Sequence, residues 1–123
     1  TCPSGGPLVQ HAVVAMFEAH HQGKISIEKI VEKMCHNPAK IFKIEKRGFI
    51  KEGYYADIAI VNAYLPWKIK KENILYKCGW SPLDGFEFPA TVTHTFINGH
   101  LVYGNGVWDE SQMGLRLAFD RNI

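Results

Sequence analysis

The spacing of apolar residues changes once along this 123-residue chain, between residues 44 and 48. Before that point apolar residues recur every three or four positions, which is typical of helices packed by one face, and after it they alternate or run together as in strands. With 46% apolar residues, a chain of this length is large enough to bury a core as one domain of ordinary size. The sequence therefore predicts an α+β arrangement with helices first and strands second.

The first predicted helix covers residues 7–22. Pro7 suits a first helical turn, and Gly23 suits the residue after a helix end. Two adjacent rows at helical spacing form a broad apolar face: Leu8, Ala12, Ala15 and Ala19 in one, and Val9, Val13 and Met16 in the other.

A second helix is predicted directly after Ser26, which is a good N-cap residue. Because the residue before a proline is disfavoured in helical geometry, we expect this helix to end near Asn37 and a short new one to begin with Asn37 as its cap and Pro38 in its first turn. The core-facing stripe of the second helix is Ile27, Ile30, Val31, Met34 and Cys35.

The second half of the chain predicts strands and turns. Gly48 and Gly53 bracket a short strand, and the nearly continuous apolar run over residues 56–61 predicts a strand covered on both faces. Asn98-Gly99 is the preferred pair for a two-residue hairpin turn, so residues 91–97 should pair with 100–103. The expected cross-strand pairs are Ile97 with His100, Phe96 with Leu101, and His94 with Tyr103.

Charge and composition exclude several classes of protein. A formal charge of +2, from 14 basic and 12 acidic residues, gives no field that favours binding to nucleic acid. The longest apolar stretch is far shorter than the roughly 20 residues of a membrane span. The cysteines Cys2, Cys35 and Cys78 show no CxxC spacing, which favours reduced thiols and a cytoplasmic protein.

No catalytic or metal-binding constellation is complete in this chain. The six histidines include no HxH or HExxH spacing, and in the predicted hairpin His94 and His100 point to opposite faces. The nucleophile motif GxSxG and the common nucleotide-binding glycine motifs are absent. From the residues alone we therefore predict no catalytic residue and no metal ligand here.

Three stretches together resemble the carboxyl-terminal part of the cyclic amidohydrolases. GKISIEKIVEKMCHNPAKIF followed by GFIKEGYYADIAIVN is similar to a helix, an NPA(K/R)xF turn and a G-x-I-x-x-G-x-x-A-D-I signature of that superfamily. KCGWSPLDGFEFPATVTHTFINGHLVYGNG is similar to the SP(F/L)-x-G turn and final hairpin of the dihydroorotases. PSGGPLVQH resembles their loop after the last barrel strand, although Leu8 and Val9 stand where many relatives have Gly-Leu/Phe-Glu.

This resemblance implies a fold and a site. Residues 1–47 would be the end of a (β/α)₈ catalytic barrel, with the substrate loop and last helices, and residues 48–123 part of a small β-sandwich domain. Ser4 and Gly5 match loop positions that touch dihydroorotate, mainly through backbone, near a helix N-terminus. In that family, bound zinc activates a bridging water. The zinc ligands, and the Asp that serves as general base, precede the part matched here.

The resemblance also leaves alternatives open. The parent would be a zinc-dependent dihydroorotase, while this fragment itself should be inactive. A dihydropyrimidinase, hydantoinase or allantoinase shares the NPA and ADI features, and an inactive relative would act as a non-catalytic assembly module. The remaining alternative is an autonomous β-rich interaction domain. Because the apolar face of the first helix would lack its usual cover, we expect homo-oligomers.

Overall fold

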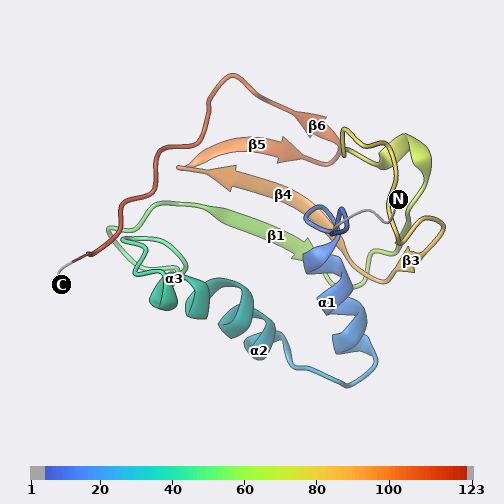
Figure 1. The fold of residues 1–123 in the computed structure, drawn as a ribbon, viewed down its shortest axis with the longest axis horizontal. Coiled ribbons are helices and arrows are strands. Elements are labelled where there is room, and N and C mark those ends of the chain that lie inside the picture. The colour runs from blue at the N-terminus through green and yellow to red at the C-terminus, as the bar shows by residue number, and fades with distance from the viewer. Residues whose placement is uncertain (1–4, 122–123) are drawn as a thin grey trace. The chain divides into compact units, whose positions relative to one another are not determined.

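The computed structural model describes residues 5–121 and divides into two compact units. Unit 1 combines residues 1–25 with 62–91, and unit 2 combines residues 26–61 with 92–123. Helices and strands both contribute (Figure 1), as the sequence predicts. Each unit is therefore built from two stretches that are separated in sequence, and each is described here by itself.

Unit 1 packs one helix with one short ribbon. Helix α1 spans Ala12–His21, strand β2 spans Trp67–Lys68, the 3₁₀ turn η2 spans Lys71–Asn73, and strand β3 spans Glu87–Phe88. Strands β2 and β3 are antiparallel, with Trp67 opposite Phe88 and Lys68 opposite Glu87. The side chains buried in this unit are His11, Val14, Phe17, Ile69, Ser81, Phe88 and Ala90.

Helix α1 begins five residues later than predicted. Residues 9–11 form a turn, closed by the bond from His11 N–H to the carbonyl of Leu8 at 3.1 Å, and the helix starts at Ala12. The predicted apolar rows are also wrong at this end, because Val9 is 90% exposed while Val14 and Phe17 are buried. The predicted end is confirmed, since Gly23 has φ +69° and donates its N–H to the carbonyl of His20.

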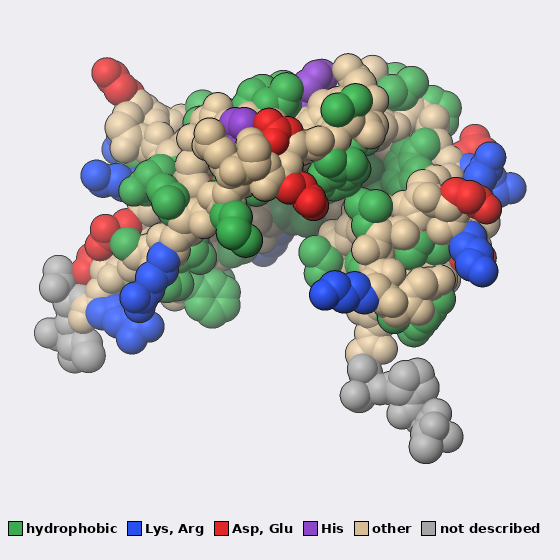
Figure 2. Space-filling view, turned by 90° about the horizontal axis from the view of Figure 1, so that it is seen from above, with side chains coloured by type: hydrophobic (Ala, Val, Ile, Leu, Met, Phe, Trp, Pro, Cys, Tyr) green, Lys and Arg blue, Asp and Glu red, His purple; other side chains and the backbone are tan. Residues whose placement is uncertain are grey.

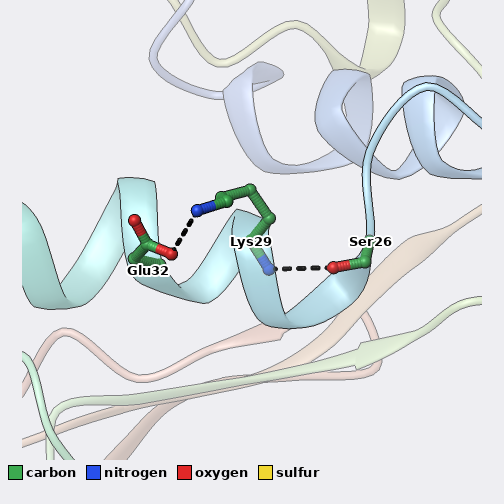
Figure 3. Close-up of polar contacts among 3 residues, drawn as sticks. All are labelled: Ser26, Lys29 and Glu32. Atoms are coloured by element: carbon green, nitrogen blue, oxygen red, sulfur yellow. Dashed lines mark hydrogen bonds and ion pairs between the residues drawn. The ribbon is translucent and has the colours of Figure 1, made fainter.

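Unit 2 contains one continuous helical run in three parts: α2 at Ile27–Val31, the π-helical turn η1 at Glu32–His36, and α3 at Asn37–Ile41. The predicted cap is confirmed, because Ser26 Oγ accepts the N–H of Lys29 at 3.2 Å (Figure 3). Lys29 also pairs with Glu32 across one turn at 2.6 Å on the exposed face. This bond to Lys29 lowers the pKa of the Glu32 carboxyl.

The predicted break at Asn37-Pro38 is wrong. Asn37 keeps helical angles (φ −66°, ψ −43°), and α3 is preceded by His36, whose side chain makes no cap bond. A π-helical turn takes up one extra residue and changes the local hydrogen-bond ladder, so a helix can pass a proline that has no N–H to donate. The change from α to π geometry therefore replaces the expected break.

The main sheet of unit 2 has the order β1-β4-β5-β6 (Figure 1). Its strands are β1 at Ile58–Asn62, β4 at Thr91–Ile97, β5 at His100–Gly104 and β6 at Val107–Trp108. The Asn98-Gly99 hairpin is confirmed, with φ of +50° and +82° at its two turn residues. The predicted double cover of the strand at 56–61 is not seen in this chain, where Ile60 is 45% exposed.

The register of the hairpin agrees with the prediction near the turn and departs from it farther away. Ile97 faces His100 and Phe96 faces Leu101, as expected, but Tyr103 lies opposite Thr95 rather than His94. A β-bulge places one extra residue on β5 and shifts the pairing beyond it by one position. His94 still lies on the opposite face from the Ile97–His100 pair, because side chains alternate along β4.

The expected strand between Gly48 and Gly53 is replaced by turns. Both glycines have positive φ, +78° and +79°, which an extended strand does not allow. At Gly48 a Cβ atom would lie 2.5 Å from Ala39 Cβ and 2.7 Å from the carbonyl oxygen of Cys35. The backbone of this turn therefore packs directly on the helical run, and it needs glycine there for both conformation and space.

The surface carries charges of both signs. On the face shown in Figure 2, acidic and basic side chains are interspersed rather than gathered by sign. None of the helices within residues 5–121 is long and apolar enough to cross a membrane.

Candidate substrate loop

The loop proposed from the sequence to touch a substrate lies in unit 1, ahead of α1. Ser4 lies outside the described residues. Gly5 is exposed, has φ +79°, and no atom within residues 5–121 lies within 4 Å of the position that a Cβ would occupy. Gly6 is also exposed with open space around it, so a small molecule has access to the backbone of both glycines.

The helix N-terminus does not lie beside Gly5 in the sequence, contrary to expectation. Helix α1 begins at Ala12, seven residues after Gly5, and its N-cap residue His11 makes no side-chain cap bond. The electrostatic effect of a helix end falls off within one turn. Any contact of the Gly5 backbone with an anion would therefore depend on its own N–H groups and on how the loop is held.

The residue after the loop, Gln10, is clamped by the segment 73–76 of the same unit. Its backbone N–H donates to Tyr76 Oη at 2.8 Å, and its side-chain Nε2 donates to the carbonyl of Asn73 at 2.8 Å. Its Oε1 accepts the N–H of Leu75 at 2.9 Å. The Gln10 amide thus pairs with this segment through both its donor and its acceptor.

His11 is completely buried in an aromatic cluster. Its ring centroid lies 5.8 Å from Trp67, 5.7 Å from Tyr76 in an edge-to-face arrangement, and 6.3 Å from Phe88. His11 Nδ1 and Ser81 Oγ are hydrogen-bonded at 3.2 Å, and Nε2 has no hydrogen-bond partner among the residues that the structure describes. Burial away from water lowers the pKa of His11, so its ring is kept neutral.

Sequence reasoning missed both Gln10 and His11. It placed them as polar positions on a longer helix, whereas the structure makes them the attachment point of the loop. The sequence held one indication of this: His11, Val14 and Phe17 recur every three residues and so lie on one side of the helix, and all three are buried. A polar residue on a buried row indicates a specific hydrogen-bond partner.

Each of the remaining histidines contacts a residue of its own unit. His20 Nδ1 lies 2.9 Å from the carbonyl of Ile25, and His21 Nε2 lies 2.7 Å from that of Ala63. In unit 2, His36 stacks on Phe49 with ring centroids 4.3 Å apart. His94 Nδ1 lies 3.0 Å from Thr93 Oγ1, and His100 pairs with Asp109 at 2.9 Å.

No group of three His, Cys, Asp or Glu side chains that could hold a metal ion occurs within residues 5–121. The acidic residue beside His100 is already engaged, because hydrogen bonds from Ser111, with a smaller contribution from His100, lower the pKa of Asp109. The described residues therefore do not fit a zinc site. Among the described residues, a shallow depression in unit 2 is lined by the exposed stretch Arg116, Leu117, Ala118, Phe119 and Arg121.

Comparisons with known proteins place the chain in a family. Residues 4–102 match the Amidohydrolase family. The dihydroorotase of Pyrococcus furiosus is 39% identical over 99 residues, 80% of this chain and 24% of that protein. The dihydroorotase of Halobacterium salinarum is 33% identical over 124 residues, 98% of this chain and 27% of that protein.

Solved structures agree with this relationship. The L-hydantoinase (dihydropyrimidinase) from Arthrobacter aurescens superimposes with a TM-score of 0.78 at 26% identity, over 87% of this chain and 24% of that structure. The chain thus spans about a quarter of the length of the relatives that it matches.

Proposed function

This chain belongs to the amidohydrolase family, and from that premise we propose that it is the carboxyl-terminal part of a dihydroorotase. The complete enzyme would interconvert dihydroorotate and N-carbamoyl-aspartate in pyrimidine biosynthesis. The observation that carries the proposal is the identity of 33–39% to two dihydroorotases over 80–98% of the chain. The NPAKIF and SPLDG motifs quoted above agree with it.

Within that enzyme, residues 1–47 would complete the barrel and residues 48–123 would belong to the small β domain. This division follows the order of the family motifs along the chain. The backbone around Ser4 and Gly5 would contact the substrate. Support for this role comes from Gly5, whose backbone is exposed and uncrowded.

Zinc would be held by residues outside this chain. The described side chains form no ligand set, so we assign this chain no step that involves a metal. Its own contribution would be to bind and orient the substrate through the loop. We further propose a cytoplasmic enzyme, because Cys35 and Cys78 are free thiols, and a homo-oligomer, because large apolar side chains are exposed.

The test compares two proteins. A full-length enzyme that contains this chain should hydrolyse dihydroorotate and contain zinc, whereas the isolated 123-residue chain should turn over no dihydroorotate and retain no stoichiometric zinc after dialysis. Turnover by the isolated chain would refute the assignment of the catalytic groups to other segments. A full-length enzyme that ignores dihydroorotate would refute the substrate.

A hydantoinase or dihydropyrimidinase is the second candidate, favoured by the structural similarity to the Arthrobacter aurescens enzyme. Assays of the full-length enzyme with dihydroorotate, hydantoin, dihydrouracil and allantoin separate these functions. A non-catalytic assembly module would hydrolyse none of the four substrates and would copurify with an active enzyme.

A further inference from the structure

We propose that Gln10 and His11 are positioning residues, which fix the Gly5 loop by tying its end to the segment 73–83 and thereby set substrate affinity. The inference rests on the proposed function, since it concerns the same loop. Neither residue is expected to touch the substrate. Their effect would be carried by the backbone of residues 5–9.

The loop has little packing of its own. Gly5, Gly6, Leu8 and Val9 are exposed, and Val9 is 90% exposed. The turn bond from His11 N–H to Leu8 closes the end of the loop directly at the buried ring. On its carboxyl-terminal side, the position of the loop therefore depends on how firmly Gln10 and His11 are held.

Gln10 is attached to a segment that is itself ordered by hydrogen bonds. Asn73, which accepts from Gln10, donates its side-chain Nδ2 to the carbonyl of Lys68 at 2.9 Å and accepts the N–H of Lys70 at 2.9 Å. The Gln10 bonds to Asn73, Leu75 and Tyr76 close loops of more than 60 residues. Such long-range attachment restrains the loop in a way that local turn bonds cannot.

His11 adds a second attachment through burial. The ring fills the space between Trp67, Tyr76 and Phe88, and Ser81 Oγ, which also accepts the N–H of Leu83 at 3.2 Å, bonds its Nδ1. The two attachments therefore lie on consecutive residues and reach both ends of the segment 73–83. A substitution that removes one attachment leaves the other in place, so single substitutions should weaken substrate affinity only in part.

A loosened loop would spend part of its time in conformations that do not bind. Apparent affinity falls in proportion to the binding-competent fraction, while the chemical step in the bound complex is unchanged. Loss of the Gln10 side-chain bonds should then raise KM about tenfold and leave kcat within about twofold. A residue with a merely structural role would lower the amount of folded enzyme and so reduce kcat at unchanged KM.

The experiment uses the full-length enzyme that contains this chain, with dihydroorotate as substrate. Gln10→Ala removes both side-chain bonds, and Gln10→Glu keeps the shape but loses the donor to Asn73. His11→Phe keeps the ring packing without the Ser81 bond, and His11→Asn keeps a nitrogen near the Nδ1 position. Gln22→Ala is the matched control, because the exposed Gln22 side chain at the C-cap of α1 donates to Glu18, far along the chain from the loop.

Hydrogen exchange supplies a readout that is independent of activity. In Gln10→Ala, the hydrogen-bonded amides of residues 10, 11 and 75 should exchange about tenfold faster, while those of β4 and β5 should not change. Tyr76→Phe, which loses a single acceptor for Gln10 N–H, should show a smaller increase at the same sites and a smaller rise in KM.

The outcomes separate this inference from the proposed function. Unchanged KM together with unchanged exchange at residues 10 and 11 in Gln10→Ala overturns the inference and leaves the dihydroorotase assignment intact. An equal loss of kcat with unchanged KM also overturns it. If the wild-type enzyme does not hydrolyse dihydroorotate, the substrate assignment fails, and the exchange at residues 10 and 11 alone decides whether the end of the loop is held by Gln10 and His11.

Discussion

Arg47 and Asp57 form an ion pair beneath the hairpin turn of unit 2, with Arg47 Nε 3.0 Å from Asp57 Oδ2. This Nε–H is not aligned for a hydrogen bond, so the contact is one of charge. Both side chains also bind Asn98, whose Oδ1 accepts from Arg47 Nη2 at 2.9 Å and whose N–H donates to Asp57 Oδ1 at 2.8 Å. The guanidinium lies 4.1 Å from the Tyr55 ring centroid. One buried arginine thus joins the segment after α3 to the turn between β4 and β5.

Arg47→Lys should lower the free energy of unfolding by about 1–2 kcal/mol, because lysine keeps the charge but loses the planar fork that reaches both Asp57 and Asn98. A double-mutant cycle of Arg47→Ala with Asp57→Ala, measured by urea unfolding, should give a coupling of about 1 kcal/mol or more.

The matched control for that cycle is the exposed pair Lys29–Glu32 (Figure 3), whose side chains are 50% and 39% accessible. Its coupling should be clearly smaller, because water and salt screen charges on exposed side chains. Equal couplings for the two pairs would show that the burial of Arg47 adds nothing.

Gly48→Ala should be much more damaging than Gly53→Ala. Both glycines have φ near +79°, so each substitution pays the strain of a left-handed residue, about 1 kcal/mol. Only at Gly48 would the added Cβ collide with Ala39 and the carbonyl of Cys35, while nothing lies within 4 Å at Gly53. We expect a loss above about 2 kcal/mol for Gly48→Ala by denaturant titration. Comparable losses at the two sites would contradict the close packing.

The neutral His11 predicts a loss of stability in mild acid. Folding lowers the pKa of His11 below its ordinary value of 6.5. As the pH falls below 6.5, the imidazole is therefore protonated in the unfolded chain but stays neutral in the folded one, which favours unfolding. The contribution of neutral His11 to the free energy of unfolding is fully present above pH 6.5 and declines below it, by at most about 1.4 kcal/mol per pH unit. His11→Phe should lose less stability than the wild type between pH 7.5 and 5.5. Parallel pH profiles for the two proteins would exclude His11 as the cause.

The exposed apolar side chains predict self-association of the isolated chain. Val9, Ile50 and Met113 are each at least 90% exposed, and Ile41 is 73% exposed. Sedimentation velocity at increasing concentration should show a rising weight-average mass, and Ile50→Lys should reduce it. A single monomer species over the whole range would refute this prediction.

Sequence reasoning succeeded where the cause of a structure is local. Ser26 caps the residues beside it, and Asn98-Gly99 determines its own turn conformation. A second Asn-Gly pair, Asn105-Gly106, also has two positive φ values between β5 and β6, and the same rule would have found that turn. The NPA and ADI motifs indicated the amidohydrolase family by their resemblance to known sequences, not by a local physical cause.

The rest of the site could not be predicted because its causes lie far away in the sequence. The partners of Gln10 are 63–66 residues distant, and the ring of His11 depends on Trp67, Tyr76 and Phe88. The local pattern places His11 on the buried row of α1, but it does not identify these distant partners. The π-helical turn and the bulge in β5 likewise shift a register by one residue, and the period of the sequence does not show where.

The two units are interleaved along the chain, and this fixes an order of events during synthesis. Gln10 leaves the ribosome more than sixty residues ahead of Tyr76, and His11 waits even longer for Phe88. Because long-range contacts form slowly, the nascent segment around Gln10 and His11 cannot complete its packing until its distant partners are synthesised. The helical run at 27–41 depends on hydrogen bonds within itself, so it can form earlier. A ribosome that pauses before residue 88 would therefore expose the unfinished aromatic cluster of unit 1 to chaperones, because the His11 ring still lacks Phe88.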